Sequence, residues 1–523
     1  MSARPLMGGV LSVLFAATLS TAQARDWTEL AITPMADPLS ANPPRLVTGK
    51  TLPGDAEPYR CDQAEAPDFS VPLTLAVAVD LALCQNPQVQ SAWAAIKVQA
   101  AQVGEARSAY LPTLTLGASR LHQNTITSES NFVVNTDRTS TAQYATLSWR
   151  LLDMGARDAN RRSANALLNA ALASHEAVLQ TTMAKAIGAY FDAQTAKAAH
   201  AAKGKNELLA RRTLETARKR ESGGTGARAD TLQAQTALAR AELDNARSLG
   251  AYEKAVSALA VILGLPLQAQ TTGIMLADDN LDTVYAFRND LAGRLSMAQQ
   301  QHPALLSARS QLEAVREKLI AARSEGLPTI DFTHSRHING LPNQGLSSTG
   351  MRQTYSGFTL NIPLFEGFGR TYKVRGAQAQ IEVKEAELRD IESRVLDEVA
   401  RAHADAVAAL RNLESSSRLA GTAMAALEEV RKKYERGVAD VLEMLNVQAS
   451  LAQAEQEQVR TQAEWRSARL RLLASAGTIG RKDVRESGHP LEIGNGSSVL
   501  NGHPNRHPVW YLEEEGRKTL ARR

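Results

Sequence analysis

Four short segments of the chain alternate apolar and polar residues with the two-residue period of a β-strand. In the clearest of them, Phe358 and Leu360 share one face while Thr359 and Asn361 share the other. Polar stretches rich in Asn, Ser, Thr and Gly separate the members of each pair. The pattern predicts four strands of about ten residues, each with one apolar and one polar face, at about 113–125, 143–152, 328–337 and 355–364.

Long stretches without proline predict very long helices around these strands. The chain has 19 prolines, yet none lies between Pro112 and Pro266 or between Pro363 and Pro490. Proline inside a helix costs about 3 kcal/mol, so such gaps are typical of uninterrupted helices. We expect two helices of about 65 residues, each roughly 100 Å long, at 156–221 and 371–435, with shorter helices at 88–110, 227–263, in the stretch before Gly326, and at 440–476.

The chain repeats its own pattern after 213 to 216 positions. Asn86-Pro87 recurs as His302-Pro303, and Leu151-Leu152-Asp153 with Arg157 recurs as Leu364-Phe365-Glu366 with Arg370. A period this long indicates a duplicated half rather than a solenoid. We expect two equivalent repeats, 73–266 and 290–476, joined by an equatorial linker at 267–289; in each, two shorter helices stack end to end beside a long one.

The predicted strands have the length and the two unlike faces of a membrane pore wall. A tilted strand of about ten residues crosses a bilayer, whereas four strands cannot close a barrel and open edges are not tolerated in lipid. Three copies of the chain would supply twelve strands, an even number of the usual kind. The alternative is a small soluble sheet packed on the helices.

The N-terminus has the features of a secretory signal at residues 1–24. Arg4 precedes an apolar stretch that ends near Leu19, and Ala22-Gln23-Ala24 is a cleavage pattern. A short buried helix is the alternative. Residues 25–72 lack periodicity and predict an extended segment, and the Gly-, Asn- and His-containing residues 477–523 predict a mobile tail.

The two cysteines, Cys61 and Cys84, lie early in the exported chain. In an oxidising compartment they can form one disulfide, worth roughly 3 kcal/mol. Two buried free thiols are the alternative.

Composition and motifs disfavour an enzyme, a cofactor site or a nucleic-acid partner. The 59 basic and 55 acidic residues nearly balance, and no uninterrupted apolar run after the N-terminus is long enough for a transmembrane helix. The Gly224-x-Gly226 spacing follows a helix and not a strand, so it is not a dinucleotide fingerprint. His334 and His337 fall on opposite faces of a predicted strand. We therefore expect no cofactor, no metal and no catalytic residues.

Several motifs together resemble the TolC-like outer-membrane efflux and secretion family over roughly residues 70–477. They are Leu73-Thr74-Leu75, Asn86-Pro87, Tyr110-Leu111-Pro112, Leu232 to Leu238 and Leu364-Phe365-Glu366-Gly367. The resemblance implies a homotrimer in which a 12-stranded outer-membrane barrel continues into a periplasmic α-helical barrel, docked to an adaptor and an inner-membrane pump such as an ABC transporter. Within the family, the chain is most similar to the type I secretion components.

The resemblance also implies a periplasmic tip and gate. The tip glycines are Gly224 and Gly437, Asp230 and Tyr434 match closure residues, and Glu443 falls where some relatives place a pore-lining carboxylate. The usual latch arginine is replaced by Ala439, which makes Arg228 or Arg436 a candidate substitute, and a second acidic position is Asn446. For each of these residues the alternative is a solvated helix face.

The function expected is a passive outer-membrane exit duct, with type I protein secretion slightly favoured. Small-molecule efflux of drugs or metals is the alternative from the same class. A periplasmic coiled-coil structural protein without a pore is the alternative from another class, but it has no need of amphipathic strands.

Overall fold

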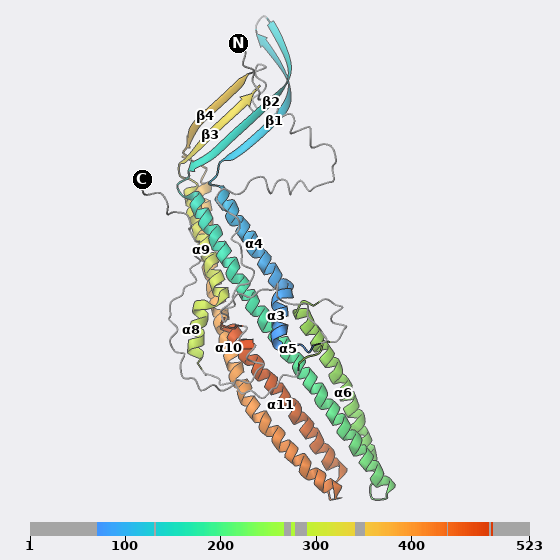
Figure 1. Cartoon of the computed structure of the whole chain (residues 1–523). Coiled ribbons are helices and arrows are strands. Elements are labelled where there is room, and N and C mark those ends of the chain that lie inside the picture. Colours follow the sequence, from blue (N-terminus) through green and yellow to red (C-terminus); the bar gives the residue numbers. More distant parts are fainter. Residues whose placement is uncertain are drawn as a thin grey trace, which may run out of the picture.

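A computed structural model describes residues 71–129, 132–265, 274–277, 290–339, 351–436, 438–480 and 483–484, and every structural statement below concerns these residues. They form an elongated molecule with a β-sheet at one end and long helices running away from it (Figure 1). The expected signal peptide, almost all of the segment 25–72, most of the linker, Cys61 and Gly437 lie outside the described residues.

The helices of the two repeats match in length, element by element. Two helices of 11 residues, two of 22, two of 67 and two of 35 occur in the same order in each half. The first set is α3 (Leu75–Gln85), α4 (Pro87–Ser108), α5 (Ala156–Ser222) and α6 (Arg228–Ile262), and the second is α8 (Leu291–Gln301), α9 (Pro303–Ser324), α10 (Gly369–Glu435) and α11 (Val441–Ser475). The duplication predicted from the sequence is confirmed.

The same local chemistry divides the helices in both repeats. Asn86 and His302 cap α4 and α9 with a side-chain acceptor, and each is followed by proline at the first helical position, where its missing N–H is no loss. Gly264 and Gly477 end α6 and α11 with positive φ angles of 72° and 74°. A Cβ at Gly264 would come within 2.6 Å of the Gln85 carbonyl oxygen, so only glycine allows this close approach.

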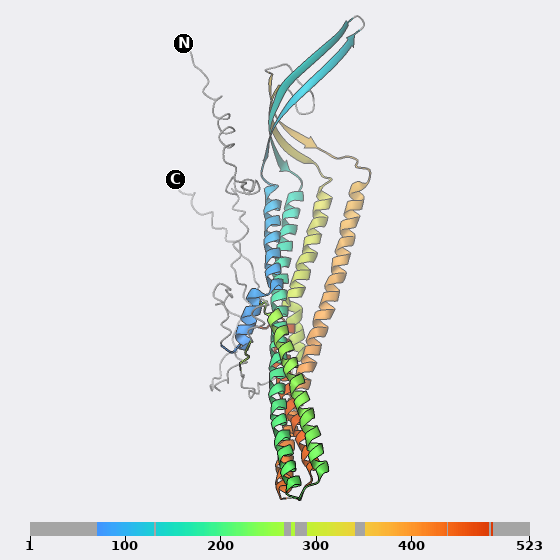
Figure 2. The same ribbon diagram turned by 90° about the vertical axis from the view of Figure 1, so that its right-hand side faces the viewer.

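The helices form a single curved layer in which short helices stack beside long ones. In one half of the layer the order is α4, α5, α9 and α10, and in the other half it is α6, α5, α11 and α10 (Figures 1 and 2). Thus α9 and α11 fill, end to end, the space between α5 and α10. None of the described helices combines the length and apolarity needed to span a membrane.

The sheet is antiparallel with strand order β1-β2-β3-β4. Its strands are β1 (Thr113–Glu129), β2 (Phe132–Leu152), β3 (Thr329–Ile338) and β4 (Arg352–Asn361). β1 and β2 pair along their whole lengths, whereas β2 pairs with β3 only as far as Gln143 opposite Ile338. The first hairpin therefore extends beyond the second as a two-stranded ribbon (Figure 2).

Two strand predictions need correction. The first hairpin was expected to end near residue 125 and resume at 143, but pairing continues to Glu129 and Phe132. The Thr, Ser and Asn residues of this stretch show no alternation of apolar and polar positions, so the two-residue period gave no signal there. β4 ends at Asn361 and does not reach 364, because Pro363 has no N–H to donate to a ladder.

The two faces of the sheet differ as the alternation predicts. Leu114, Leu116, Phe358 and Leu360 belong to one face, with exposed fractions between 60% and 73%. On the opposite face His337 is 5% exposed, and the ring of Tyr144 lies over Gly117, where a Cβ would overlap it. Crowded side chains on the polar face and open side chains on the apolar face show that the sheet is concave on its polar side.

The largest core lies midway along the helices, where α3 and the ends of α6 and α11 pack on α5. Leu73 forms a parallel bridge to Leu276 of the linker, and the Tyr190 hydroxyl donates to the Leu73 carbonyl over 3.2 Å. Ile479 and Val484 are 0% and 2% exposed in this core. The start of the predicted mobile tail is therefore packed, because its apolar residues cover the end of α11.

Cys84 is half-buried on α3. Since Cys61 lies outside the described residues, the Cys61–Cys84 disulfide stays a prediction.

Candidate functional site

The end of the helices farthest from the sheet is built by two hairpin turns, one from each repeat. Between α5 and α6, the Arg220 carbonyl accepts hydrogen bonds from the backbone N–H groups of Thr225 and Gly226, at 2.9 and 3.0 Å. Gly224 has a φ of 71°, which favours glycine. Between α10 and α11, Asp440 caps α11 by accepting the Glu443 N–H at 2.7 Å.

An arginine and a tyrosine join these two turns. The guanidinium carbon of Arg220, in the last turn of α5, lies 4.4 Å from the ring centroid of Tyr434, in the last turn of α10. Its Nη2 also donates to the Tyr434 carbonyl oxygen at 2.8 Å. Tyr434 is 5% exposed and packs with Val430, Val441 and Met444. Arg220 is half-buried, so a cation–π contact of about 1 kcal/mol acts together with the charged hydrogen bond to join the two repeats here.

A second polar link lies about two turns farther along α5 and joins this helix to α11. The Gln448 Nε2 of α11 donates to the Thr213 Oγ1 of α5 at 3.2 Å, and both residues are buried. Buried polar groups are costly unless paired, so this hydrogen bond fixes the register between α5 and α11. The α10–α11 hairpin is thus attached to α5 at two levels near the tip.

The structure places the sequence-predicted tip residues in the expected turns but does not bring them together. Arg228, Arg436 and Glu443 are exposed, and Asp230 is half-buried in the first turn of α6. None of these four side chains has a hydrogen-bond or ion-pair partner among the described residues of the single chain. Their roles in a gate stay predictions, and Gly437 lies outside the described residues.

Arg220 is the tip residue that sequence reasoning missed. It lies 214 positions from Tyr434, and it stands in a run of basic and acidic residues at the end of a long helix. The signal that could have identified it is a difference between the two repeats at these positions. The equivalent of Arg220 in the second repeat is Lys433, and the equivalent of Tyr434 in the first repeat is Glu221.

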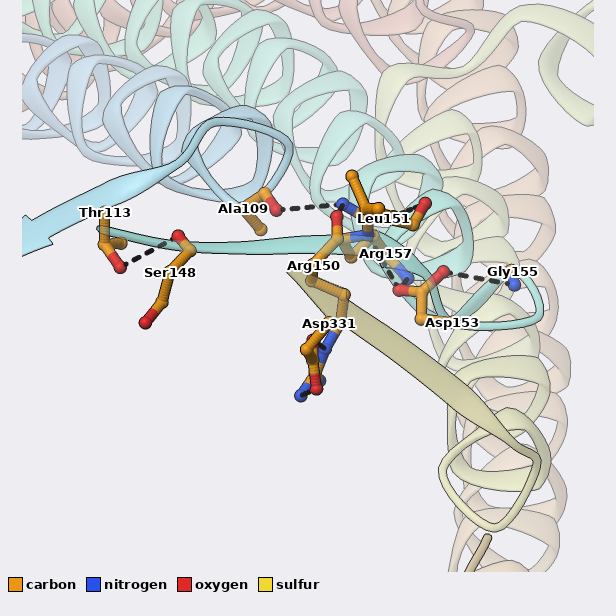
Figure 3. Close-up of polar contacts among 9 residues, drawn as sticks. All are labelled: Ala109, Thr113, Ser148, Arg150, Leu151, Asp153, Gly155, Arg157 and Asp331. Atoms are coloured by element: carbon orange, nitrogen blue, oxygen red, sulfur yellow. Dashed lines mark hydrogen bonds and ion pairs between the residues drawn. The ribbon is translucent and has the colours of Figure 1, made fainter. Parts of the chain in front are cut away.

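At the opposite end of the helices, the repeated Leu-Leu-Asp motif builds the joint between sheet and helix (Figure 3). The Arg157 guanidinium donates to the carbonyl oxygens of Arg150 at 2.7 Å, Leu151 at 3.1 Å and Ala109 at 3.3 Å, and to the Asp153 carboxylate at 2.9 Å. Its guanidinium carbon also lies 4.9 Å from the ring centroid of Tyr110. The Arg157 side chain therefore hydrogen-bonds the backbone carbonyl groups at the point where β2 ends and α5 begins.

The second repeat builds the same joint with fewer contacts. Arg370 donates to the carbonyl oxygens of Gly326 and Arg323, each at 2.9 Å. A Cβ at Gly326 would overlap the Arg370 guanidinium, so glycine replaces Tyr110 to admit the arginine. Leu364 and Phe365 beside this joint are 92% and 76% exposed.

Near the first joint, the opening turn of α5 carries a charge network. A hydrogen bond from Arg161 lowers the pKa of Asp158, and Arg162 also pairs with this carboxylate. A carboxylate in the first helical turn also complements the helix dipole. These ion pairs are solvent-exposed and orient the start of α5 more than they stabilise it.

Side chains from α5, α6, α10 and α11 together line an open groove along one face of the helical layer. Charges of both signs lie along it, including Lys185, Asp192, Arg394, Arg401, Asp405 and Glu464. Among the described residues, no three His, Cys, Asp or Glu side chains are placed to hold a metal.

The chain matches the family model described as "Outer membrane efflux protein" over residues 78–265 and 294–478, which are the two repeats. It is 36% identical over 412 residues to Protein CyaE of Bordetella pertussis, covering 79% of this chain and 85% of CyaE. It is 22% identical over 269 residues to the alkaline protease secretion protein AprF of Pseudomonas aeruginosa, covering 50% of this chain and 54% of AprF.

The fold is also similar to a solved structure. The Campylobacter jejuni CmeC outer membrane channel superimposes with a TM-score of 0.68 at 16% identity, over 82% of this chain and 91% of CmeC.

Proposed function

The chain belongs to the outer membrane efflux protein family, and we propose that within this family it is the exit duct for a type I protein secretion system. It is an outer-membrane efflux or secretion channel and not an enzyme, in a family whose members form trimers. The cargo, the adaptor and the pump are parts of the proposal.

The sheet supports a barrel that is closed by three copies. The outer edges of β1 and β4 have no neighbouring strand among the described residues of the single chain, and unpaired backbone groups are not tolerated in lipid. The exposed apolar face suits lipid, and the concave polar face suits water. Twelve strands from three chains would remove every edge.

The helical layer supports a duct that continues this barrel across the periplasm. Its long helices span about 100 Å at 1.5 Å per residue, and its open groove carries charges of both signs. A mixed wall suits an unfolded polypeptide, whose side chains carry both signs. Energy would come from an inner-membrane ABC transporter reached through a periplasmic adaptor that docks at the tip.

Protein secretion is favoured over small-molecule efflux by the relatives. CyaE matches at 36% identity over most of its length, and AprF is named for the secretion of an alkaline protease. The observation that carries the proposal is the CyaE match, because it spans both repeats.

The test is deletion of this chain in the bacterium that encodes it, with complementation by the wild-type protein. We expect one or a few proteins to disappear from the culture medium, by quantitative proteomics, without a change in susceptibility to drugs or metals. An unchanged set of secreted proteins together with increased susceptibility would establish small-molecule efflux instead.

A further inference from the structure

The apolar face of the sheet changes to basic at the end far from the helices. Strand pairing places Leu116, Ala145 and Arg336 in one row across β1, β2 and β3, all on this face. A row nearer the helices contains Trp149, Phe332 and Phe358. Arg336 therefore lies at the edge of the apolar surface that is farthest from the helices. It is about 13 Å along β3 from Phe332, at 3.3 Å per residue.

A second arginine stands diagonally across from the first. Arg336 pairs with Thr354, and Arg352 pairs with Ile338, so Arg336 and Arg352 are diagonal neighbours on the same face of β3 and β4. Diagonal neighbours lie roughly 7–8 Å apart, within reach of long side chains. We call Arg336 and Arg352 the outward arginine pair.

The outward arginine pair has no anionic partner in the part of the chain that the structure describes. Both residues are exposed, and neither makes an ion pair or side-chain hydrogen bond with another described residue. Arg120, on the same face of β1, is exposed and unpaired in the same sense. Like charges at diagonal positions repel, so a bound anion would relieve a cost built into the sheet.

The surroundings of the pair suit the phosphate of a lipid. The His334 ring and the Ser356 hydroxyl are hydrogen-bonded at 2.7 Å on this face, between the outward arginine pair and the aromatic row. A phosphate held by two guanidinium groups at this height would leave acyl chains lying on Phe332, Phe358 and Trp149. Guanidinium binds phosphate in a bidentate fashion, and basic residues at a membrane surface recruit anionic lipids.

We propose that the outward arginine pair binds the phosphate group of an anionic lipid in the outer leaflet, with one site per protomer. The site faces away from the duct and plays no part in transport itself. It fixes the height of the sheet in the membrane, because the phosphate marks the boundary between headgroups and acyl chains.

The experiment measures lipid binding to the detergent-purified trimer by native mass spectrometry. The probes are dioleoyl phosphatidic acid and dioleoyl phosphatidylcholine, which share acyl chains and differ in headgroup charge. We expect the wild type to retain up to three phosphatidic acid molecules, and Arg336→Gln/Arg352→Gln to bind them roughly ten- to thirtyfold more weakly. Arg336→Lys/Arg352→Lys should be intermediate, since it keeps the charge and loses the bidentate geometry.

The matched control is Arg212→Gln/Arg240→Gln, which removes the same charge from exposed positions on α5 and α6. The proposal is overturned if this control weakens phosphatidic acid binding equally, or if the sheet variant loses phosphatidylcholine to the same extent. Displacement of the lipid by millimolar inorganic phosphate would assign a free-anion site and also overturn it. Because the measured species is the intact trimer, a variant that fails to assemble is recognised by the absence of the trimer mass, and the lysine variant then carries the test.

Discussion

Arg220 and Tyr434 join the two repeats at the tip by two contacts that the repeats do not share. The guanidinium carbon lies 4.4 Å from the ring centroid, and Nη2 donates to the Tyr434 carbonyl oxygen at 2.8 Å. The duplication produced two equivalent hairpins, but the reciprocal contact does not exist. Lys433 stands at the position equivalent to Arg220, and Glu221 stands at the position equivalent to Tyr434. The tie therefore holds the α10–α11 hairpin to α5 within one chain.

Removing this tie should open the duct. Arg220→Ala loses the cation–π contact and the charged hydrogen bond, together about 2 kcal/mol or more, which is about a thirtyfold shift toward separated hairpins. Single-channel recording in planar bilayers should show longer open times or larger steps. Arg212→Ala on the same helix is the control, and equal effects of the two variants would contradict the prediction.

The tyrosine tests the same contact from the other side. Arg220 binds the ring face and the backbone carbonyl of Tyr434, so the hydroxyl is dispensable. Tyr434→Phe should conduct like the wild type, and Tyr434→Ala should resemble Arg220→Ala. A large effect of Tyr434→Phe would show that closure uses the hydroxyl.

Glu443 should set the ion selectivity of the assembled channel. It is exposed in the first turn of α11, and in a trimer it would form a ring of three carboxylates that attracts cations. Glu443→Ala should reduce cation selectivity, read from the reversal potential in a salt gradient, while Asn446→Asp should add a second ring and increase it. Unchanged reversal potentials in both variants would place the constriction elsewhere.

Arg157 should matter more for stability than Arg370. Arg157 bonds three carbonyl oxygens and a carboxylate, whereas Arg370 bonds two carbonyl oxygens. Arg157→Ala removes three hydrogen bonds to backbone carbonyls, worth roughly 1 kcal/mol each, and leaves the buried Asp153 carboxylate without its cation. It should therefore lower the thermal unfolding midpoint of the trimer well beyond Arg370→Ala. Equal shifts would mean that the joint does not depend on these contacts.

His302 should make stability depend on pH. Burial lowers the pKa of His302, and its neutral Nδ1 accepts the Ala304 N–H at 3.2 Å as the cap of α9. Since the folded pKa is below the unfolded value of about 6.5, this stabilisation is complete above about pH 6.5 and is lost as pH falls through the folded pKa. The contribution is about 1 kcal/mol, the usual value of such a cap.

The first repeat provides the matched variant for this test. Asn86 caps α4 at the equivalent position without titrating. His302→Asn should therefore keep the cap and flatten the pH dependence, measured as the difference in unfolding midpoint between pH 5 and 7.5. A difference equal to that of the wild type would rule out His302 as its source.

The sequence by itself determined the elements, their order and their duplication. Proline gaps and glycine ends are local signals, so the helices from Ala156 and Val441 were predicted to within a residue or two of their bounds. Alternation located β3 and β4 because apolar and polar residues occupy opposite faces of these strands, which gives a period of two. It failed on the ribbon that extends past the Gln143–Ile338 pair, where polar residues occupy both faces and show no period of two.

Only the tertiary structure decided which residues meet. Arg220 and Tyr434, or Arg336 and Arg352, carry no mutual signal in the sequence, since their pairing depends on helix packing and on strand register. The Arg157 motif was visible as a repeat, but its task, holding three backbone carbonyls at the sheet–helix joint, depends on three segments converging in space. Local chemistry therefore determines each helix and strand, whereas the contacts between distant elements depend on how those elements pack in three dimensions.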